Sequence, residues 1–366
     1  MKKHIHLIGI GGSGMSSIAH VLLEQGYKVS GSDQSLSAMA LNLRESGAVV
    51  YQGHAAEHIL GASLVVRSSA ISDENPEVLA AQHAGIPVMK RMDFIHTLLD
   101  QRESIAVAGS HGKTTSSAML AWSLQQTGID AGYILGGTSL NLNSNAHSGS
   151  SPYFVIEADE YDHMFLGIEP KIVLLTNVEY DHPDCFPTVS SYHTAFSTFI
   201  QQIKPGGALV LNADDQSYYR LKKFFPSQKY HVLEYSQENK LNSKIEKAIK
   251  ERFPENFNQN NARLISTIAL ELGIDKNQIS QSLISFEGVP GRMQFIKNDK
   301  NFKVVVDFAH TPQGLRSALT ALRFIMKKEK MPGKLIAVYG CAGLRDAIKR
   351  PMMGQIGVEL ADLLVF

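Results

Sequence analysis

Short apolar runs alternate with longer segments of helical periodicity along the first hundred residues. The runs His4 to Ile8, Tyr27 to Ser30 and Leu64 to Ser68 have the length of buried strands, and Ser16 to Gln25 has the spacing of a helix. Strands that alternate with helices are typical of βαβ units, which build a parallel sheet. The pattern predicts an α/β domain over residues 1–101.

A second α/β domain is predicted after the polar stretch 100–103. Its strands are expected over four apolar runs: Ser104 to Ala108, Tyr153 to Ile156, Lys171 to Thr176 and Ala208 to Leu211. Helices are expected over Ser190 to Ile203 and Ala262 to Leu272, whereas residues 216–260 show little periodicity. We expect this central domain to cover residues 102–293.

A third segment follows Pro290-Gly291-Arg292. Phe302 to Asp307 and Leu335 to Tyr339 are predicted strands on either side of a helix, Gln313 to Met326. The chain ends in the apolar run Leu363 to Phe366, which we expect to be a strand without a partner. The pattern predicts a third, smaller α/β domain over residues 294–366 that is incomplete.

Composition narrows the class of protein. The 366 residues, 44% hydrophobic, exceed the usual size of one core and fit two or three domains. Lys plus Arg (35) equals Asp plus Glu (35), so we expect no binding to nucleic acid or to a membrane. We find no signal peptide, no apolar run of about 18 residues, and no metal-site spacing around Cys185 and Cys341. We expect a cytoplasmic monomer or homodimer.

A glycine-rich loop joins the first predicted strand to the first predicted helix. It reads Gly9-Ile10-Gly11-Gly12-Ser13-Gly14. Glycines allow a tight turn, and unpaired N–H groups at a helix N-terminus bind phosphate. Asp33 stands about 20 residues further on, where a dinucleotide-binding enzyme places the acid that holds a ribose. The loop predicts a diphosphate site, and a nicotinamide dinucleotide remains one candidate ligand.

A second loop carries a stronger signal for nucleotide binding. Between a predicted strand and a predicted helix lies the segment Ala108-Gly109-Ser110-His111-Gly112-Lys113-Thr114-Thr115. Its N–H groups can surround the β-phosphate of ATP, with Lys113 at the β/γ oxygens and Thr114 on Mg²⁺. Val107 stands where the P-loop pattern has its first glycine, so the match is one position short. We expect this loop to bind ATP and Mg²⁺.

Candidate metal ligands and polar residues follow two further predicted strands. One strand runs into Glu157-Ala158-Asp159-Glu160-Tyr161-Asp162, and the next is followed by Asn177 and His182. A carboxylate at the end of a strand beside a phosphate loop is well placed to bind Mg²⁺. Glu157, nearest the strand, is the preferred ligand, and the other three acids fit a solvated turn. His182 is a candidate second ligand, and Asn177 can orient a ligand or water.

Together these segments resemble the Mur ligase family over roughly residues 1–215. The motifs that carry the resemblance are Gly9 to Ser16, Ser30 to Asp33, Ser68 to Ser72 with Asn75-Pro76, Gly109 to Thr115, Glu157 to Glu160, and Thr176 to Glu179 with Asp181-His182. Their order and spacing along the chain follow the family pattern. The resemblance is closest to the branch that adds L-alanine to UDP-N-acetylmuramate in peptidoglycan precursor synthesis.

The resemblance implies a three-domain Mur ligase architecture. A Rossmann-like N-terminal domain would bind the UDP of the substrate, a P-loop central ATPase domain would bind ATP and Mg²⁺, and a partial Rossmann-like C-terminal domain would close over the nucleotide and supply the amino acid. The implied reaction is ATP-dependent formation of an amide bond through an acyl phosphate. The first glycine loop would then receive a UDP diphosphate instead of NAD.

Residue roles follow from the same resemblance. The implied catalytic set is Lys113, Glu157 and His182, with Thr114, Glu157 and His182 on the metal. The implied substrate-binding residues are Gly11, Gly12, Ser13, Gly14, Met15, Asp33, Ser69, Ala70 and Asn177. Asn261 resembles the family's adenine-contacting asparagine, Arg292 the arginine at the entry to the last domain, and Asp307 the acid that meets the ATP ribose.

The last part of the chain departs from the alanine-adding branch. Asp307 to Pro312 and residues 340–351, which include Arg345 and Asp346, are closer to members that add the third residue, diaminopimelate or lysine. The predicted helix Ser190 to Ile203 contains no lysine that could be carbamylated as a metal bridge. A third-residue ligase, a tripeptide-recycling ligase and a nucleotide-binding protein without catalysis therefore remain alternatives.

Overall fold

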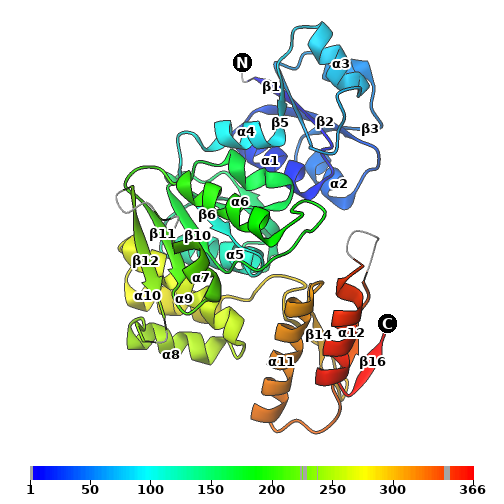
Figure 1. Ribbon diagram of the computed structural model, residues 1–366. Coiled ribbons are helices and arrows are strands. Elements are labelled where there is room, and N and C mark those ends of the chain that lie inside the picture. Colours follow the sequence, from blue (N-terminus) through cyan, green and yellow to red (C-terminus); the bar gives the residue numbers. More distant parts are fainter. Residues whose placement is uncertain (1–2, 223–224, 226–228, 237, 342–346) are drawn as a thin grey trace.

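The computed structural model describes residues 3–222, 225, 229–236, 238–341 and 347–366. Three α/β units follow one another along the chain, and the first and third lie at opposite ends of the central one (Figure 1). The α/β architecture predicted from the sequence is thereby confirmed. Within the described residues no helix combines the length and apolar character needed to cross a bilayer.

The first unit is a five-stranded parallel sheet with the order β3-β2-β1-β4-β5. Its strands are β1 (His4–Ile8), β2 (Lys28–Asp33), β3 (Val49–Gln52), β4 (Leu64–Arg67) and β5 (Val88–Lys90). They alternate with α1 (Ser13–Glu24), α2 (Ala38–Glu45), the 3-10 helix η1 (Ala56–Ile59), α3 (Pro76–His83) and α4 (Arg91–Leu99). The strand order reverses beside β1, and doubly wound sheets bind ligands at such a point, at the carboxyl ends of the strands.

The central unit is a seven-stranded sheet with the order β12-β11-β10-β6-β9-β7-β8. Its strands are β6 (Glu103–Ala108), β7 (Gly132–Ser139), β8 (Ser144–His147), β9 (Tyr153–Glu157), β10 (Ile172–Leu175), β11 (Gly207–Asn212) and β12 (Tyr230–Tyr235). Its helices are α5 (Lys113–Gln126), η2 (Tyr161–Gly167), α6 (Val189–Gln201), α7 (Gln216–Leu221), α8 (Ser243–Arg252), α9 (Asn256–Glu271) and α10 (Lys276–Ser285). Edge strand β8 is antiparallel to β7, and the other pairs are parallel.

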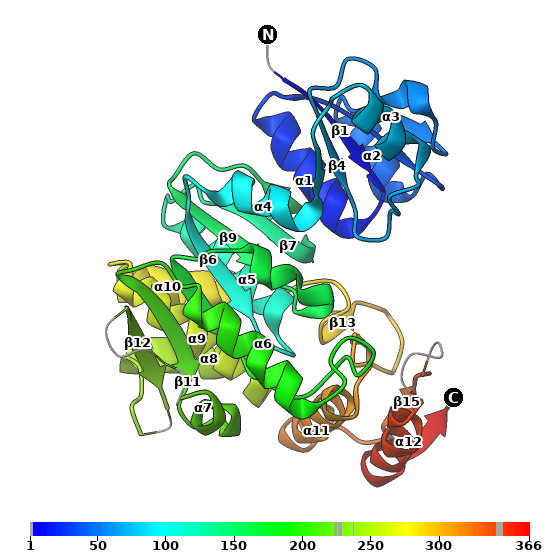
Figure 2. The same ribbon diagram turned by 45° about the horizontal axis from the view of Figure 1, so that its top comes forward.

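The side chains of β6 are buried on both faces of the central sheet, as expected of a strand in the middle of a parallel sheet. Ile105 and Val107 face the core that contains α5, α9 and α10. Ala106 and Ala108 face a second core, to which α6 contributes Phe196 and its neighbours. Helix α6 crosses this second face (Figure 2). The glycine loop after β6 and the acidic turn after β9 therefore start from a rigid layer.

The third unit has two short sheets packed with two helices. Strand β13 (Gln294–Ile296) pairs antiparallel with β14 (Val304–Val306), and β15 (Ile336–Val338) pairs parallel with β16 (Leu363–Val365). Helices α11 (Pro312–Lys328) and α12 (Lys349–Leu360) pack against each other. The expectation of an unpaired last strand is wrong, because α12 returns the chain alongside β15 and sets Leu363 opposite Ile336.

The largest gap in the predicted elements lies in residues 216–260. This segment contains α7, β12, α8 and the first residues of α9, none of which the weak periodicity indicates. Helix α9 also begins at Asn256, six residues before its predicted start at Ala262. Between Tyr235 and Asn261 the described residues form α8 and the first turns of α9, and they include no strand.

A buried carboxylate links several elements of the first unit through hydrogen bonds. Glu77, at the start of α3, is fully buried and accepts hydrogen bonds from Ser32 Oγ (2.5 Å), His58 Nδ1 (2.8 Å) and His54 Nδ1 (3.0 Å). His6 Nε2 lies 3.6 Å from Glu77 Oε1. Burial alone would raise the pKa of Glu77, but the close approach of His6 and the hydrogen bonds from Ser32 and His58 lower it to about 2.

Replacing Glu77 with alanine should lower the free energy of unfolding by about 3–5 kcal/mol at pH 7, because a buried ionic network loses its only anion. The folded pKa of about 2 lies below the ordinary value of 4.5, so this contribution is complete above about pH 5 and is lost as pH falls towards 2. Guanidinium denaturation of wild type and Glu77→Ala across this range measures it. Exposed Glu45→Ala is the control, and a difference that does not shrink in acid contradicts the account.

Candidate active site

The second glycine loop packs closely against two other segments of the central unit. It leaves β6 at Ala108 and enters α5 at Lys113. Gly109 has a φ of +134°, and a methyl group on it would lie 2.0 Å from Thr176 Oγ1 at the end of β10. A methyl group on Gly112 would lie 2.7 Å from Asn261 Oδ1 at the start of α9. Both positions therefore need glycine, which also tolerates positive φ.

Asn177 braces this loop instead of pointing freely into solution. Its Oδ1 accepts a hydrogen bond from the His111 N–H (3.1 Å), and its Nδ2 donates to the His111 carbonyl (3.2 Å). The Ser110 N–H donates to the Asn177 carbonyl (3.0 Å). Asn177 therefore positions the phosphate-binding backbone, and it also lines the cleft, so its role as a substrate-binding residue stays a prediction.

Glu157 lies beside the start of α5. Its Oε1 accepts a hydrogen bond from Thr114 Oγ1 (3.0 Å), and its Oε2 accepts one from the Gly136 N–H (2.8 Å). Burial raises the pKa of Glu157, and the charge of Lys113 opposes that rise. A carboxylate disfavoured in its charged form, next to a hydroxyl of the loop, is suited to an oxygen-liganded cation.

The ammonium group of Lys113 contacts a different acid, Glu160. Its Nζ donates to Glu160 Oε2 (2.6 Å) and to the Gly109 carbonyl (2.6 Å). Glu160 is only 1% exposed, so it is not part of a solvated turn as the sequence suggested. Burial would lower the pKa of Lys113, but the charge and hydrogen bond of Glu160 raise it overall. His182 Nε2 lies 3.8 Å from Glu160 Oε1.

The predicted nucleotide residues converge on one cleft of about 650 Å³. It is lined by Ser110, His111, Gly112, Lys113, Thr114, Thr115, Glu157, Asn177, His182, Asn261, Arg292 and Asp307, together with Phe308, His310 and Thr311 from the third unit. The central unit thus supplies the phosphate loop and the carboxylates. The third unit supplies the facing wall.

Residues at the entry to the third unit reach across this cleft. Arg292 Nη2 lies 3.4 Å from Thr114 Oγ1, and the guanidinium stacks over Phe308 at 4.3 Å from the ring centroid. Asp307 accepts hydrogen bonds from the Met293 N–H (2.7 Å) and the Ala309 N–H (2.9 Å), while burial raises its pKa. Arg292 and Asp307 therefore organise the junction between the two units as well as lining the cleft.

The first glycine loop has the geometry of an anion site. Gly12 precedes α1, which has no side-chain cap and no acid in its first turn. The Gly11 N–H donates to Asp33 Oδ2 (2.9 Å), so Asp33 fixes the loop. A methyl group on Gly9 would lie 3.1 Å from Ser68 Cβ, which places the turn containing Ser69 and Ala70 beside the loop. Unpaired N–H groups at the start of α1 are free to bind phosphate oxygens.

Arg91, which the sequence analysis missed, lies against this loop. A methyl group on Gly14 would lie 1.8 Å from Arg91 Nη1. Arg91 Nε is buried without a hydrogen-bond partner, and no carboxylate of the described residues forms an ion pair with the guanidinium. Burial lowers its pKa, and the more distant charges of Asp159 and Asp162 oppose this. A cation at the positive end of a helix is unfavourable unless an anion joins them.

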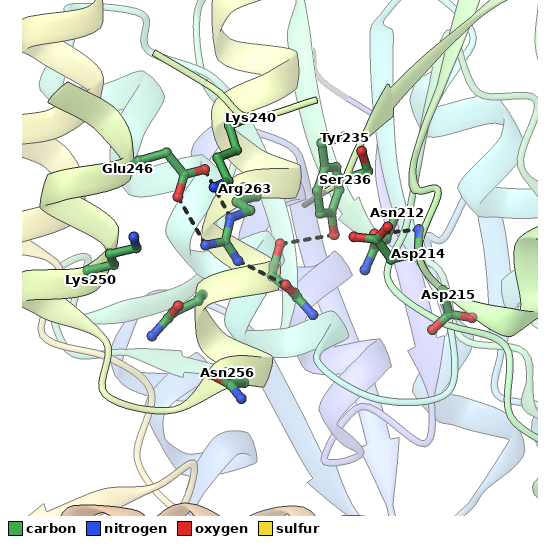
Figure 3. Close-up of a pocket in the computed structure, with 12 residues that line it drawn as sticks. Asn212, Asp214, Asp215, Tyr235, Ser236, Lys240, Glu246, Lys250, Asn256 and Arg263 are labelled. Carbon is green, nitrogen blue, oxygen red and sulfur yellow. Dashed lines mark hydrogen bonds and ion pairs between the residues drawn. The ribbon is translucent and has the colours of Figure 1, made fainter. Parts of the chain in front are cut away.

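A second pocket of about 560 Å³ adjoins the cleft and shares Asn212, Asp215 and Asn260 with it. Figure 3 shows Arg263 beside Glu246 among the residues that line it. The guanidinium pairs with Glu246 at 3.0 Å and donates to Asn260 Oδ1 (3.1 Å). Tyr235 donates to the Asn260 carbonyl (3.1 Å). These polar groups satisfy one another, and the pocket has no phosphate loop, so we do not assign the chemistry to it.

The predicted metal ligands Thr114, Glu157 and His182 line the same cleft, and their role stays a prediction. Among the described residues no three His, Cys, Asp or Glu side chains form a metal-binding group, so Glu157 and His182 share the cleft without a third such ligand. The burial of Glu160 and the position of Arg91 depend on α6 and on the first glycine loop, which are distant from them in sequence. Arg345 and Asp346 lie outside the residues that the structure describes.

Sequence models of one family match nearly the whole chain. The model described as "Mur ligase family, catalytic domain" matches residues 4–103, "Mur ligase middle domain" residues 107–275, and "Mur ligase, glutamate ligase domain" residues 291–366. The domain boundaries near 101 and 293 stay predictions. All three matches fall on the units seen in the structure.

Individual proteins extend the comparison. UDP-N-acetylmuramate--L-alanine ligase of Roseiflexus sp. is 32% identical over 92% of this chain and 78% of its own length. The protein of the same name from Renibacterium salmoninarum is 37% identical, over 88% and 73%. A murein peptide ligase structure from Psychrobacter arcticus superposes with a TM-score of 0.75 at 26% identity, covering 99% of this chain and 84% of that one. The Thermotoga maritima UDP-N-acetylmuramate-alanine ligase gives 0.79 at 24%, with the same coverage.

The fold and the cleft define a multidomain α/β protein with a P-loop in its central unit. The three matching models and the relatives above 30% identity make the assignment specific. This chain belongs to the Mur ligase family, as its resemblance predicted.

Proposed function

We propose that this protein joins L-alanine to UDP-N-acetylmuramate in an ATP-dependent reaction that forms an amide bond. The observation that carries the proposal is the pair of glycine loops, one with an unpaired arginine and one with a lysine and two carboxylates. Relatives named for this reaction are 32% and 37% identical over most of the chain, which favours L-alanine over the third-residue and tripeptide alternatives.

The first loop is assigned to the UDP diphosphate. Backbone N–H groups of Gly12 to Met15 would face the phosphates, and Arg91 would supply the positive charge beside them. Asp33 holds the loop in shape, and Ser69 and Ala70 lie on the neighbouring turn. The nicotinamide reading has no support from the family.

The cleft is assigned to ATP. The loop from Gly109 to Thr115 would surround the phosphates, Asn261 would contact the adenine, and Asp307 would meet the ribose. Asn261 is 6% exposed and lies beside Gly112, which fits a base placed close to the loop. Arg292 would contribute a further positive charge near Thr114.

In the reaction, the sugar-linked carboxylate attacks the γ-phosphorus of ATP, and the bond to ADP breaks. The amine of alanine, once deprotonated, then attacks the acyl carbon and releases phosphate. Both steps bring anionic groups together, so charge stabilisation and positioning dominate the catalysis. Lys113 is placed to hold the β and γ oxygens, and the wall formed by Phe308, His310 and Thr311 would exclude water.

The donor set fits Mg²⁺, which prefers oxygen ligands and usually takes one or two carboxylates in addition to phosphate oxygens and water. Thr114 and Glu157 would hold it, with His182 in the same cleft as a further ligand. When bound, Mg²⁺ would neutralise phosphate charge. We place the reaction in the cytoplasm, because ATP and UDP-N-acetylmuramate are soluble nucleotides.

Lys113→Ala should lower kcat by about 100- to 1000-fold, equivalent to roughly 3–4 kcal/mol, because the transition state loses a charged contact. ADP release is measured with UDP-N-acetylmuramate, ATP and single amino acids, and L-alanine should give the fastest turnover. Lys250→Ala, in the second pocket, should behave as wild type. Near-normal ADP release by Lys113→Ala, or a preference for diaminopimelate or a tripeptide, contradicts the assignment.

Arg91→Ala should weaken the binding of UDP about 10- to 100-fold, the effect expected when a charged group loses its hydrogen-bonded partner. Binding of uridine, which lacks the diphosphate, should change little. Calorimetric titration of uridine, UMP and UDP into wild type and variant measures how much each phosphate group strengthens binding. Lys90→Ala, at the exposed neighbouring residue, is the control. If UDP and uridine differ in affinity as much in Arg91→Ala as in wild type, Arg91 does not bind the diphosphate.

A further inference from the structure

Most of the hydrogen-bonding capacity of the Lys113 ammonium is already committed. Two of its three N–H groups have partners at 2.6 Å, Glu160 Oε2 and the Gly109 carbonyl. A weaker contact at 3.5 Å reaches the Ser110 carbonyl. A lysine side chain has four flexible carbon–carbon bonds, and these two hydrogen bonds restrict where Nζ can lie. The remaining N–H is available for a phosphate oxygen.

Glu160 is itself held from a third element. Tyr192, on α6, is fully buried, and its hydroxyl lies 2.8 Å from Ser110 Oγ and 3.4 Å from Glu160 Oε1. Ser110 Oγ donates to the Glu179 carbonyl (2.6 Å) and accepts from the Glu179 N–H (2.8 Å). Because Ser110 gives its proton to Glu179, Tyr192 donates its own proton towards Ser110 and Glu160. The network joins the P-loop, the turn after β9 and α6.

This arrangement differs from an ordinary surface ion pair. Glu160 is 1% exposed and the Lys113 side chain 13%, so solvent screens the pair weakly. The pair also involves the one side chain of the loop that must meet the terminal phosphate. A displacement of about 1 Å at such a group can cost on the order of 100-fold in rate. An acid that fixes this group therefore acts directly on turnover.

We propose that Glu160 is a positioning residue that holds the Lys113 ammonium in place for phosphoryl transfer, and that Tyr192 secures Glu160. The proposal rests on the proposed function, because it assigns Lys113 to the transferred phosphoryl group. Glu160 itself touches neither substrate. It acts through Lys113, and Tyr192 acts through Glu160 and Ser110.

The test is a double-mutant cycle with Glu160→Gln, Tyr192→Phe and the combined variant. Glu160→Gln keeps the shape of the side chain and removes its charge, so kcat should fall on the order of 10- to 100-fold while KM for ATP changes by less than about 3-fold. Tyr192→Phe should lower kcat less. In the combined variant the tyrosine change should have almost no further effect, since residues of one network are not additive.

Tyr180→Phe is the matched control. The Tyr180 ring lies 5.9 Å from the Tyr192 ring, but its hydroxyl donates to the Phe186 carbonyl and does not reach Glu160. Its effect, small or large, should add to that of Glu160→Gln. A merely structural role of Tyr192 would make both tyrosine changes additive, and that outcome overturns the proposal. So does a Glu160→Gln enzyme with the kcat of wild type.

A second measurement needs no substrate. A hydrogen-bonded lysine ammonium exchanges its protons slowly enough to give a ¹H–¹⁵N signal, which Lys113→Arg identifies by its loss. We expect the signal in wild type and its loss in Glu160→Gln. A signal that persists unchanged in Glu160→Gln overturns the proposal even if the substrate assignment is right. Wild-type enzyme that releases no ADP with UDP-N-acetylmuramate and L-alanine overturns the proposed function instead, and this measurement still tests Glu160.

Discussion

The close packing of Gly109 against the end of β10 is the constraint from which the active site follows. With no side chain, Gly109 lets the loop pass directly over Thr176, and the backbone and side chain of Asn177 then hold Ser110 and His111. This contact sets the start of α5 and thereby the positions of Lys113 and Thr114. Since β6, β9 and β10 are neighbours in the sheet, the acids that follow β9 meet the loop that follows β6. The geometry of the phosphate site is therefore a consequence of strand order.

Charge is distributed to suit two anionic substrates on one molecule. The first unit presents bare helix N–H groups and Arg91, whereas the central unit presents Lys113 already balanced by Glu160. Arg91 begins α4, and α4 packs on η2, the segment that directly follows Glu160. The element that carries the cation of one loop thus touches the segment that carries the anion of the other. The third unit completes the cleft with Arg292 stacked on Phe308.

The sequence predicted the features that local chemistry determines. Both glycine loops, their strand and helix context, and the place of Glu157 at the end of β9 follow from short motifs, and the structure agrees. Lys113 and Thr114 line one cleft with Arg292 and Asp307, which lie much further along the chain, and only the family resemblance could suggest this. Short strand-loop-helix motifs are predictable because their own residues determine their backbone geometry.

The errors concern residues whose environment is set by distant segments. Glu160 sits in an acidic hexapeptide that looks solvated, but α6 and Lys113 bury it. Nor did the sequence indicate that Asn177 braces the phosphate loop through both ends of its amide. Helix α8 buries Ile245, Ala248 and Ile249 at helical spacing, but these are its only apolar residues, so a search for apolar runs misses it. The pairing of β16 depends on where α12 returns the chain.

The central claim is that a carboxylate bound at one loop attacks the terminal phosphoryl group held by the other. Oxygen-18 placed in the carboxylate of UDP-N-acetylmuramate tests it directly, since an acyl phosphate passes one carboxylate oxygen to phosphate when alanine displaces it. Mass spectrometry of the released phosphate should find one labelled oxygen for each amide bond formed. Unlabelled phosphate from a reaction that yields the amide product would contradict the account.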